Sequence, residues 1–209
     1  MANSVNFDSN ADFAGDAFLR GEALACQRGG RLVFENLSFN LSAGHALHLA
    51  GANGSGKSSL LRQLAGLLPL AAGSLAHPFM SSRDMHYLGH DDGLKAAFSV
   101  AETLALEAAL AETDMADSLL TDLGLADCAW QFIGNLSAGQ KRRLTLARLL
   151  LDPRPLWLLD EPLTALDTRG RKLVEDLAAA HLASGGMIIA ASHEALAFAT
   201  QELRLGPGA

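Results

Sequence analysis

Residues 51 to 58 read Gly-Ala-Asn-Gly-Ser-Gly-Lys-Ser, which matches the pattern G-x-x-x-x-G-K-[ST]. The glycines of such a loop let successive backbone N–H groups point at one centre and bind phosphate oxygens. Lys57 would reach the β- and γ-phosphates, and the hydroxyl of Ser58 would bind Mg²⁺. The loop therefore predicts a bound nucleoside triphosphate.

The residues on both sides of this loop fit the same interpretation. The run His45-Ala-Leu-His-Leu-Ala50 is mostly apolar and predicts a strand, whereas residues 59–68 have the apolar spacing of a helix. A helix that begins at the loop also brings the positive end of its dipole to the phosphates. The alternative, a glycine turn with an exposed lysine, explains neither flank. The residues expected to contact the nucleotide here are Gly51, Ala52, Asn53, Gly54, Ser55, Gly56, Lys57, Ser58 and Ser59.

The composition is that of a globular protein of moderate size. The chain has 209 residues, 49% of them hydrophobic, which is enough for one domain with a substantial core. Its formal net charge of −7 gives no general attraction for polyanions, so we expect no nucleic-acid partner. Cys26 and Cys128 are far apart and lack neighbours at metal-ligand spacing, which argues against a zinc site or a disulfide and favours a reducing compartment.

The order of the apolar runs predicts an α/β domain over residues 21–209, preceded by a polar extension over residues 1–20. We expect neither an export signal nor a membrane span, because no basic and apolar leader and no apolar run of about 18 residues is present. Short runs between Glu22 and Leu41 predict a small antiparallel β layer. Strands over 85–88, 156–160 and 187–191 and helices over 100–125, 142–151 and 168–183 predict a mostly parallel core sheet flanked by helices, with a helical subdomain at about 95–150.

Two adjacent carboxylates follow one of the predicted core strands. The run Leu156-Trp-Leu-Leu-Asp160 ends in an aspartate, and Glu161 comes next. Ligands of open α/β sheets bind at the carboxyl ends of the strands. We expect Asp160 to complete the Mg²⁺ ligands with Ser58, and Glu161 to polarise the water that attacks the γ-phosphate. Two acidic residues after a core strand more often cap a turn, but their place downstream of a phosphate-binding loop favours the functional interpretation.

His193 and Asp167 occupy comparable positions next to predicted elements. His193 follows the apolar strand that ends at Ala191, where an imidazole can hydrogen-bond the γ-phosphate or the attacking water. A lone histidine at the start of a loop is otherwise an ordinary solvated or capping side chain. Asp167 precedes the helix expected from Thr168 and suits its N-cap, a role that is compatible with a functional one.

A second anion-binding element is predicted at Leu136-Ser-Ala-Gly-Gln140, where a turn with Ser137 in an N-cap-like position opens a long helix. A single ATP does not need two such helix ends. The complete set of motifs, in this order, resembles the ATP-binding cassette (ABC) ATPases, the nucleotide-binding subunits of ABC transporters. The motifs that carry the resemblance are the Walker A loop at 51–58, the signature at 136–140, the Walker B pair Asp160 and Glu161, the D-loop at 163–167 and the switch histidine His193.

The resemblance covers the chain from about Glu22 to His193 and implies a P-loop NTPase fold of the ABC type. It implies catalytic roles for Lys57, Glu161 and His193. It also implies an ATP-sandwiched homodimer, in which the signature of one copy covers the ATP held by the loop of the other. On this basis the further residues expected to contact nucleotide are Ser137, Gly139, Gln140 and Asp167.

Three positions depart from the pattern of that family. Ala138 stands where glycine is commoner, and its methyl group restricts φ but should still let the N–H groups face phosphate. His90 occupies the place of the usual Q-loop glutamine, and it is either a nucleotide-site residue or a surface histidine. Arg28 aligns with the position that is usually an aromatic residue stacked on adenine, so its planar guanidinium would have to stack instead.

The segment Gly89-His-Asp-Asp-Gly-Leu-Lys95 and the Leu136–Gln140 signature resemble one subfamily, the ATP-binding subunits of cytochrome c maturation haem exporters. This resemblance implies a homodimer on the cytoplasmic face of a bacterial inner membrane, docked peripherally to separately encoded transmembrane subunits. ATP and Mg²⁺ would be its cofactors, and ATP hydrolysis would energise haem export or haem handling for c-type cytochrome biogenesis. An ATPase subunit of a transporter for another substrate remains an alternative.

Two other classes share part of the pattern. A soluble P-loop kinase would contain the Lys57 loop but has no use for the 136–140 segment. A non-transport ABC ATPase that acts on DNA or ribosomes usually carries a long coiled-coil insertion or two cassettes in one chain. The interval between Lys57 and Asp160 is too short for such an insertion.

Overall fold

The computed structural model describes residues 18–77, 82–116 and 118–206; most of the expected N-terminal extension lies outside them. These residues form two compact units. We call them the sheet unit, which comprises the described residues within 11–90, 154–162 and 178–209, and the helical unit, which comprises those within 91–153 and 163–177.

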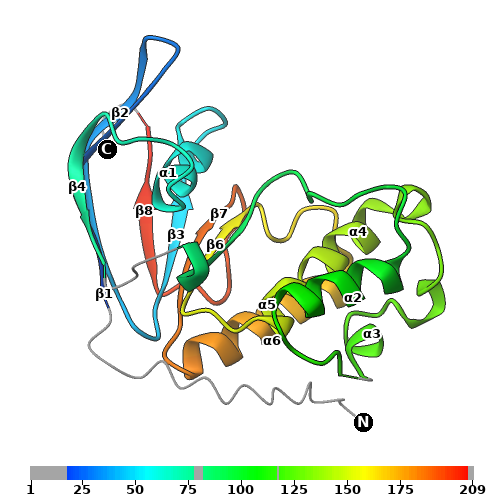
Figure 1. Ribbon diagram of the computed structural model, residues 1–209. Helices are drawn as coiled ribbons and strands as arrows, with labels where there is room; N and C mark the ends of the chain where they lie inside the picture. Colours follow the sequence, from blue (N-terminus) through cyan, green and yellow to red (C-terminus); the bar gives the residue numbers. More distant parts are fainter. Residues whose placement is uncertain (1–17, 78–81, 117, 207–209) are drawn as a thin grey trace. The chain divides into compact units, whose positions relative to one another are not determined.

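The sheet unit contains two β-sheets (Figure 1). The antiparallel sheet has the order β2-β1-β4 and is built from β1 (Phe18–Arg28), β2 (Arg31–Ser42) and β4 (Ala72–Ala76). The parallel sheet has the order β5-β6-β7-β3-β8 and is built from β3 (Ala46–Ala50), β5 (Met85–Leu88), β6 (Leu156–Asp160), β7 (Met187–Ala191) and β8 (Gln201–Arg204). The two sheets confirm the expected antiparallel layer and parallel core.

Helix α1 (Lys57–Leu64) begins inside the phosphate-binding loop and lies between the two sheets (Figure 1). Its apolar side chains Leu60, Leu61 and Leu64 are buried together with side chains from both sheets. Burial of one leucine side chain stabilises the fold by about 1.5–3 kcal/mol, so this cluster fixes the start of α1 relative to the sheets. The loop before α1 is thereby held at the carboxyl end of β3.

The helical unit contains α2 (Val100–Leu110), α3 (Leu119–Asp122), α4 (Ala138–Thr145) and α5 (Ala147–Leu151), together with the first turns of α6 (Thr168–Ala183). Short 3₁₀ turns lie at Ala126–Cys128 and Ile133–Asn135, and a third, in the sheet unit, lies at Ser82–Asp84. The helix expected over 100–125 is interrupted after Leu110, where Glu112 adopts a φ of 55° that no α-helix contains. The helix expected over 142–151 starts earlier, at Ala138, and is divided at Leu146.

The antiparallel sheet differs from the expectation in the length of its strands. The short runs between Glu22 and Leu41 belong to two long strands, of which β1 already begins at Phe18, within the expected extension. Ala23 and Asn36 have positive φ values of 46° and 54°, and the β1–β2 register shifts near Ala23. Such irregularities bend a strand without ending it, which is why the sequence suggests more turns than the structure contains.

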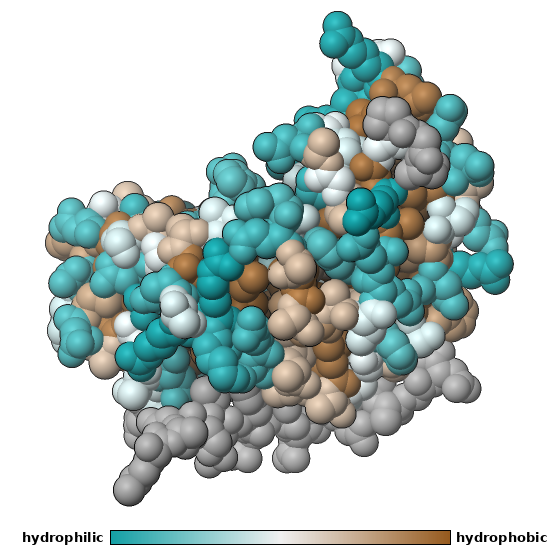
Figure 2. All heavy atoms as spheres, turned by 180° about the vertical axis from the view of Figure 1, so that it is seen from behind, coloured by the Kyte–Doolittle hydropathy of each residue, from teal (hydrophilic) through white to brown (hydrophobic). Residues whose placement is uncertain are grey.

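Among the described residues, no helix combines the length and the apolar character needed to cross a bilayer. On the face shown in Figure 2, hydrophobic residues lie in patches among hydrophilic ones. The most exposed large apolar side chains of the described residues are Trp130, Leu110 and Leu67.

Candidate functional site

The loop at 51–58 has the backbone conformation that its glycines allow. Gly51, Gly54 and Gly56 have φ values of 146°, 83° and 105°, which disfavour residues with a Cβ atom. A Cβ atom on Gly51 would also lie 2.3 Å from the carbonyl oxygen of Leu205. Alanine at either end of the loop would therefore displace its backbone.

Lys57 lies across this loop. Its ammonium group donates hydrogen bonds to the carbonyl oxygens of Gly51 at 2.7 Å and Ala52 at 3.1 Å. An ammonium group has three N–H donors, so one is left for a phosphate oxygen. Only 8% of the residue is exposed. The geometry thus holds a positive charge inside the curve of the loop.

The far wall of the loop is formed by the antiparallel sheet. A Cβ atom on Gly56 would lie 2.8 Å from side-chain carbons of both Val33 and Phe34 in β2. At the start of α1, Ser59 is hydrogen-bonded to Cys26 of β1, although burial raises the pKa of that thiol more than this bond lowers it. These contacts attach the β1–β2 hairpin to the phosphate-binding loop.

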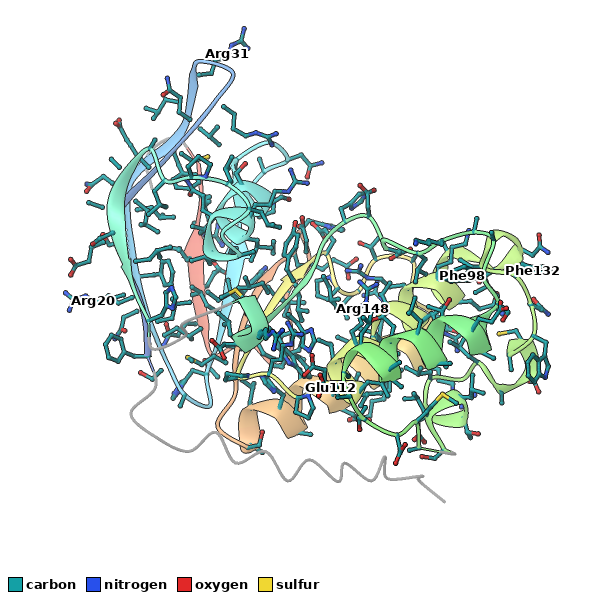
Figure 3. All side chains as sticks on the ribbon, viewed as in Figure 1. Arg20, Arg31, Phe98, Glu112, Phe132 and Arg148 are labelled. Carbon is teal, nitrogen blue, oxygen red and sulfur yellow. The ribbon has the colours of Figure 1, made fainter. Side chains whose placement is uncertain are left out.

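Arg28, the expected adenine-stacking residue, is exposed at the end of β1 and faces Arg31 across the hairpin turn. Figure 3 shows Arg31 at the tip of that hairpin, pointing away from the sheets. The turn residues Gly29 and Gly30 both have positive φ, as a two-residue hairpin loop of type I′ requires. Stacking of Arg28 on a base stays a prediction.

Asp160, Glu161 and His193 meet at the carboxyl ends of β6 and β7. Asp160 is 2% exposed and ends β6, next to Ala191 of β7. The Glu161 N–H donates to the carbonyl oxygen of Ala191 at 2.8 Å, which extends the ladder by one residue. The geometry therefore brings together two motifs that lie on separate strands, as the sequence predicts.

The side chains of Glu161 and His193 form a direct contact. Nδ1 of His193 lies 2.9 Å from Oε2 of Glu161. Because a carboxylate only accepts hydrogen bonds, Nδ1 carries the proton in this contact. Glu161 has a φ of 50°, an unusual value for a residue with a side chain. Nε2 of His193 lies 3.5 Å from Glu194, and the imidazole is 59% exposed. A water or phosphate oxygen can therefore approach the pair.

The signature segment forms the N-terminus of α4. Ser137 is the N-cap: its hydroxyl accepts from the Gln140 N–H at 3.2 Å, and the Gln140 side chain accepts from the Ser137 N–H at 2.9 Å. This capping box confirms the expected N-cap and occupies the side-chain oxygen of Gln140. Ala138 is the first residue of α4 and has no positive φ, so its methyl group fits the helix.

At position 139 the space around the backbone favours glycine, whereas the glycines of the 51–58 loop are favoured by their positive φ. Gly139 has no positive φ, but a Cβ atom on it would lie 2.8 Å from the carbonyl oxygen of Ala165. Ala165 belongs to the D-loop segment and itself has a φ of 63°. The signature and the D-loop are thus in backbone contact within the helical unit. No sequence pattern along the chain reveals this contact.

Asp167 and His90 differ in how they are held. Oδ1 of Asp167 accepts a hydrogen bond from the Gly170 N–H at 2.7 Å, which confirms that Asp167 caps α6. His90 follows β5, is exposed and makes no hydrogen bond or ion pair within the described part of the chain. Asp92, two residues further on, lies 3.5 Å from the buried guanidinium of Arg142 in α4. Within the helical unit, Asp92 is therefore held against the signature helix, a contact that the sequence does not indicate.

The phosphate-binding loop, the acidic strand end with its histidine and the capped signature helix together define a P-loop ATPase of the ABC class. The chain matches the family model for ABC transporters over residues 34–164. Two solved chains have the same fold: an ABC transporter ATP-binding protein from Pyrococcus furiosus (TM-score 0.79, 23% identity, covering 90% of this chain and 97% of that one) and the ATP-binding subunit of an ABC transporter (TM-score 0.76, 22% identity, covering 90% and 85%).

Curated relatives give the more specific assignment. The cytochrome c biogenesis ATP-binding export protein CcmA of Rhodopseudomonas palustris strain HaA2 is 48% identical over 198 residues, which cover 91% of this chain and 99% of that protein. The protein with the same description from Paramagnetospirillum magneticum is 50% identical over 192 residues, covering 85% and 88%. This chain belongs to the ABC transporter ATPases and, within them, to the family of cytochrome c biogenesis ATP-binding export proteins.

Proposed function

We propose that this ATPase is the ATP-hydrolysing subunit of a membrane ABC transporter complex that energises haem export or haem handling for c-type cytochrome biogenesis. The observation that supports this assignment best is the 48% identity, over nearly the full length of both chains, to a relative described as a cytochrome c biogenesis export protein. The proposed location is the cytoplasmic face of the bacterial inner membrane, where the chain binds separately encoded transmembrane subunits.

ATP is proposed to bind in the loop at 51–58. The N–H groups of this loop and the remaining proton donor of Lys57 would bind the phosphates. Ser58 and Asp160 would hold Mg²⁺, and a hydroxyl and a carboxylate are the oxygen donors that this ion prefers. The burial of Asp160 at the end of β6 supports this role, because buried carboxylates are usually paired or bound to metal. Bound Mg²⁺ would supply charge neutralisation at the phosphates.

Hydrolysis is proposed to depend on the Glu161–His193 pair. The carboxylate of Glu161 would orient and polarise the attacking water, and the 2.9 Å bond from Nδ1 of His193 would hold that carboxylate in place. The exposed face of the imidazole leaves room for the γ-phosphate. General-base assistance of this kind accelerates a reaction by about 10²–10⁴-fold.

A second copy of the chain is proposed to complete the site. Ser137 and Gly139 open α4 with backbone N–H groups, and a helix N-terminus of this kind attracts phosphate. These residues, with Gln140 and Asp167, lie in the helical unit, whereas Lys57 and Glu161 lie in the sheet unit. Two copies arranged head to tail would place the signature of one over the ATP of the other. Loss of the γ-phosphate would then release this closure.

The haem assignment is tested in cells in which the gene has been deleted. Wild-type protein should restore c-type cytochromes with covalently attached haem, whereas Glu161→Gln should not. Glu35→Gln is the matched control, because Glu35 is an exposed glutamate of β2. The readout is haem-dependent peroxidase staining of denatured proteins, together with co-purification of transmembrane subunits. Normal haem attachment with Glu161→Gln, despite lost ATPase activity, would instead favour a transporter for another substrate.

A further inference from the structure

His48 is a buried histidine in the middle of β3, between β7 and β8 of the parallel sheet. It lies in β3, the strand that leads into the phosphate-binding loop, and 7% of it is exposed. Its neighbours in the sheet are Ala190 of β7 and Glu202 of β8. An apolar residue would satisfy a buried position of this kind, so the imidazole calls for an explanation.

The imidazole forms a hydrogen bond to the backbone next to the catalytic histidine. Nε2 of His48 lies 3.1 Å from the carbonyl oxygen of Ser192, the residue before His193. A carbonyl oxygen can only accept, so Nε2 carries the proton. The ring of His48 therefore donates to the peptide group that joins Ser192 to His193.

The other ring nitrogen does not provide a competing hydrogen bond. Nδ1 of His48 lies 3.7 Å from Oε2 of Glu202, which is too long for one. The carboxylate of Glu202 instead accepts from Nε of Arg204 at 2.8 Å. The bond to Ser192 is thus the contact that fixes the imidazole.

The turn that carries His193 is held on the same strand by a second bond. The Ser192 N–H donates to the carbonyl oxygen of Leu49 at 3.3 Å, and the Ser192 hydroxyl accepts from the Glu194 N–H at 3.0 Å. Ser192 itself is 2% exposed. By contrast, the side chain of His193 is mostly exposed, so packing does not orient it. Besides the bond of Nδ1 to Glu161, its direction depends on the backbone that precedes it.

We infer that His48 is a positioning residue for ATP hydrolysis, which acts by holding the Ser192–His193 peptide so that His193 meets Glu161. The inference rests on the proposed roles of Glu161 and His193. Strand β3 then serves two parts of the site, since it leads into the loop at Gly51 and also supplies the donor that fixes the His193 turn. Loss of this donor would leave the phosphate-binding loop intact and disturb the alignment of the hydrolytic pair.

The test compares His48→Gln with His48→Met. The two new side chains are similar in length and unbranched, but only glutamine can donate to the Ser192 carbonyl. ATPase rates give kcat and KM, and thermal melting shows whether each variant is folded. We expect His48→Met to lower kcat about 10- to 100-fold, as small misplacements of catalytic groups do, with KM changed less than about twofold. His48→Gln should retain most of the wild-type kcat.

Thr200→Val is the matched control. The Thr200 hydroxyl accepts from the Ala46 N–H at 3.0 Å and donates to the Ala46 carbonyl at 3.1 Å. Thr200 precedes β8, so these bonds join that strand to the first residue of β3, at the opposite end of β3 from its contact with Ser192. The variant should lower the melting temperature and leave kcat unchanged. Equal kcat losses in His48→Met and Thr200→Val would show a general effect of sheet stability and overturn the inference.

Further variants distinguish a failure of the inference about His48 from a failure of the proposed Glu161–His193 pair. If His48→Met does not fold, His48→Phe keeps the ring shape without the donor and takes its place. Unfolding of both, or equal loss of kcat in the Met and Gln variants, would overturn the positioning role. Wild-type turnover in Glu161→Gln and His193→Ala would instead refute the proposed hydrolytic pair. If those two variants are inactive while a donor-free His48 variant keeps the wild-type kcat, only the inference about His48 fails.

Discussion

The sheet unit and the helical unit position their candidate functional residues by different physical means. In the sheet unit, Asp160, Glu161 and His193 stand at strand ends, where a hydrogen-bonded ladder with fixed register brings them together. In the helical unit, Ser137 and Gly139 are placed by a side-chain cap and by one close backbone contact with Ala165. The proposed hydrolytic groups thus lie at the ends of fully buried strands, whereas the signature depends on a few local bonds. Variants of the two units should therefore fail in different ways.

The largest effect is expected from Glu161→Gln in the sheet unit. Hydrolysis should fall at least about 100-fold, because the amide cannot act as a general base. ATP binding and ATP-dependent dimerisation should persist, since the loop and the signature are unchanged. Turnover assays and size-exclusion chromatography with ATP measure both properties. Unchanged turnover would remove Glu161 from its role.

Acid should destabilise the sheet unit through His181. This histidine stacks on Trp157 with ring centroids 3.9 Å apart, and burial lowers its pKa from 6.5 to about 4. A lowered histidine pKa means that the unfolded chain takes up a proton more readily. The stabilisation is therefore complete above pH 6.5 and is lost as the pH falls towards 4, by about 3 kcal/mol in total.

Urea unfolding between pH 7.5 and 4.5 measures this loss. His181→Phe is the control, because it can stack on Trp157 without titrating, so the wild type should lose stability relative to this variant as the pH falls. The fluorescence of the two tryptophans reports on the two units individually, because Trp157 lies in the sheet unit and Trp130 in the helical unit. In single-tryptophan variants, Trp157 should report the acid transition at higher pH than Trp130. The opposite order would show that other groups dominate.

Gly139→Ala should damage the helical unit without affecting the ATP-binding loop. The new Cβ atom would lie 2.8 Å from the Ala165 carbonyl, so the signature or the D-loop must shift. We expect hydrolysis to fall about tenfold, in line with about 1–3 kcal/mol for overpacking, while ATP binding to the monomer is unchanged. Ala138→Gly is the matched control on the next residue and should retain activity. If Gly139→Ala hydrolyses ATP normally, the contact between Gly139 and Ala165 does not contribute to hydrolysis.

Ser137→Ala should have the smallest effect. Loss of an N-cap costs about 1 kcal/mol, and here it would also loosen Gln140. Ser99→Ala removes an equivalent capping box at α2, outside the 136–140 signature. Both variants should lower the melting temperature by similar amounts, but only Ser137→Ala should reduce the ATPase rate. Equal rates in the two variants would limit Ser137 to a structural role.

Much of the sheet unit could be predicted from the sequence because its signals are local. The strands β5, β6 and β7 are apolar runs that end where predicted. The candidate site residues lie at their carboxyl ends or just after them. The sequence does not indicate strand β8, since Gln201–Arg204 has no apolar pattern and becomes a strand only by pairing with β3. Strand β4 is likewise short and mostly exposed.

The helical unit was predicted less well because its boundaries depend on tertiary contacts. The Ala- and Leu-rich run after Val100 favours helix throughout, and nothing in its composition indicates the break near Glu112. The roles of Ser137 and Asp167 as helix caps can be predicted from the sequence, since capping is a local interaction. The contact of Gly139 with Ala165 and the bond of His48 to Ser192 join residues far apart in the chain, so they require the structure.

Glu161 has a left-handed backbone conformation, which lowers the stability of the fold. Its carboxylate is nevertheless proposed to serve ATP hydrolysis. A residue with a Cβ atom at a φ of 50° is less stable there than glycine by roughly 1–2 kcal/mol. A screen of random variants for heat resistance alone would therefore favour glycine at this position and would discard the carboxylate. A library for a more stable version of this protein should leave residue 161 unchanged, because the proposed hydrolysis needs its carboxylate despite the unfavourable φ.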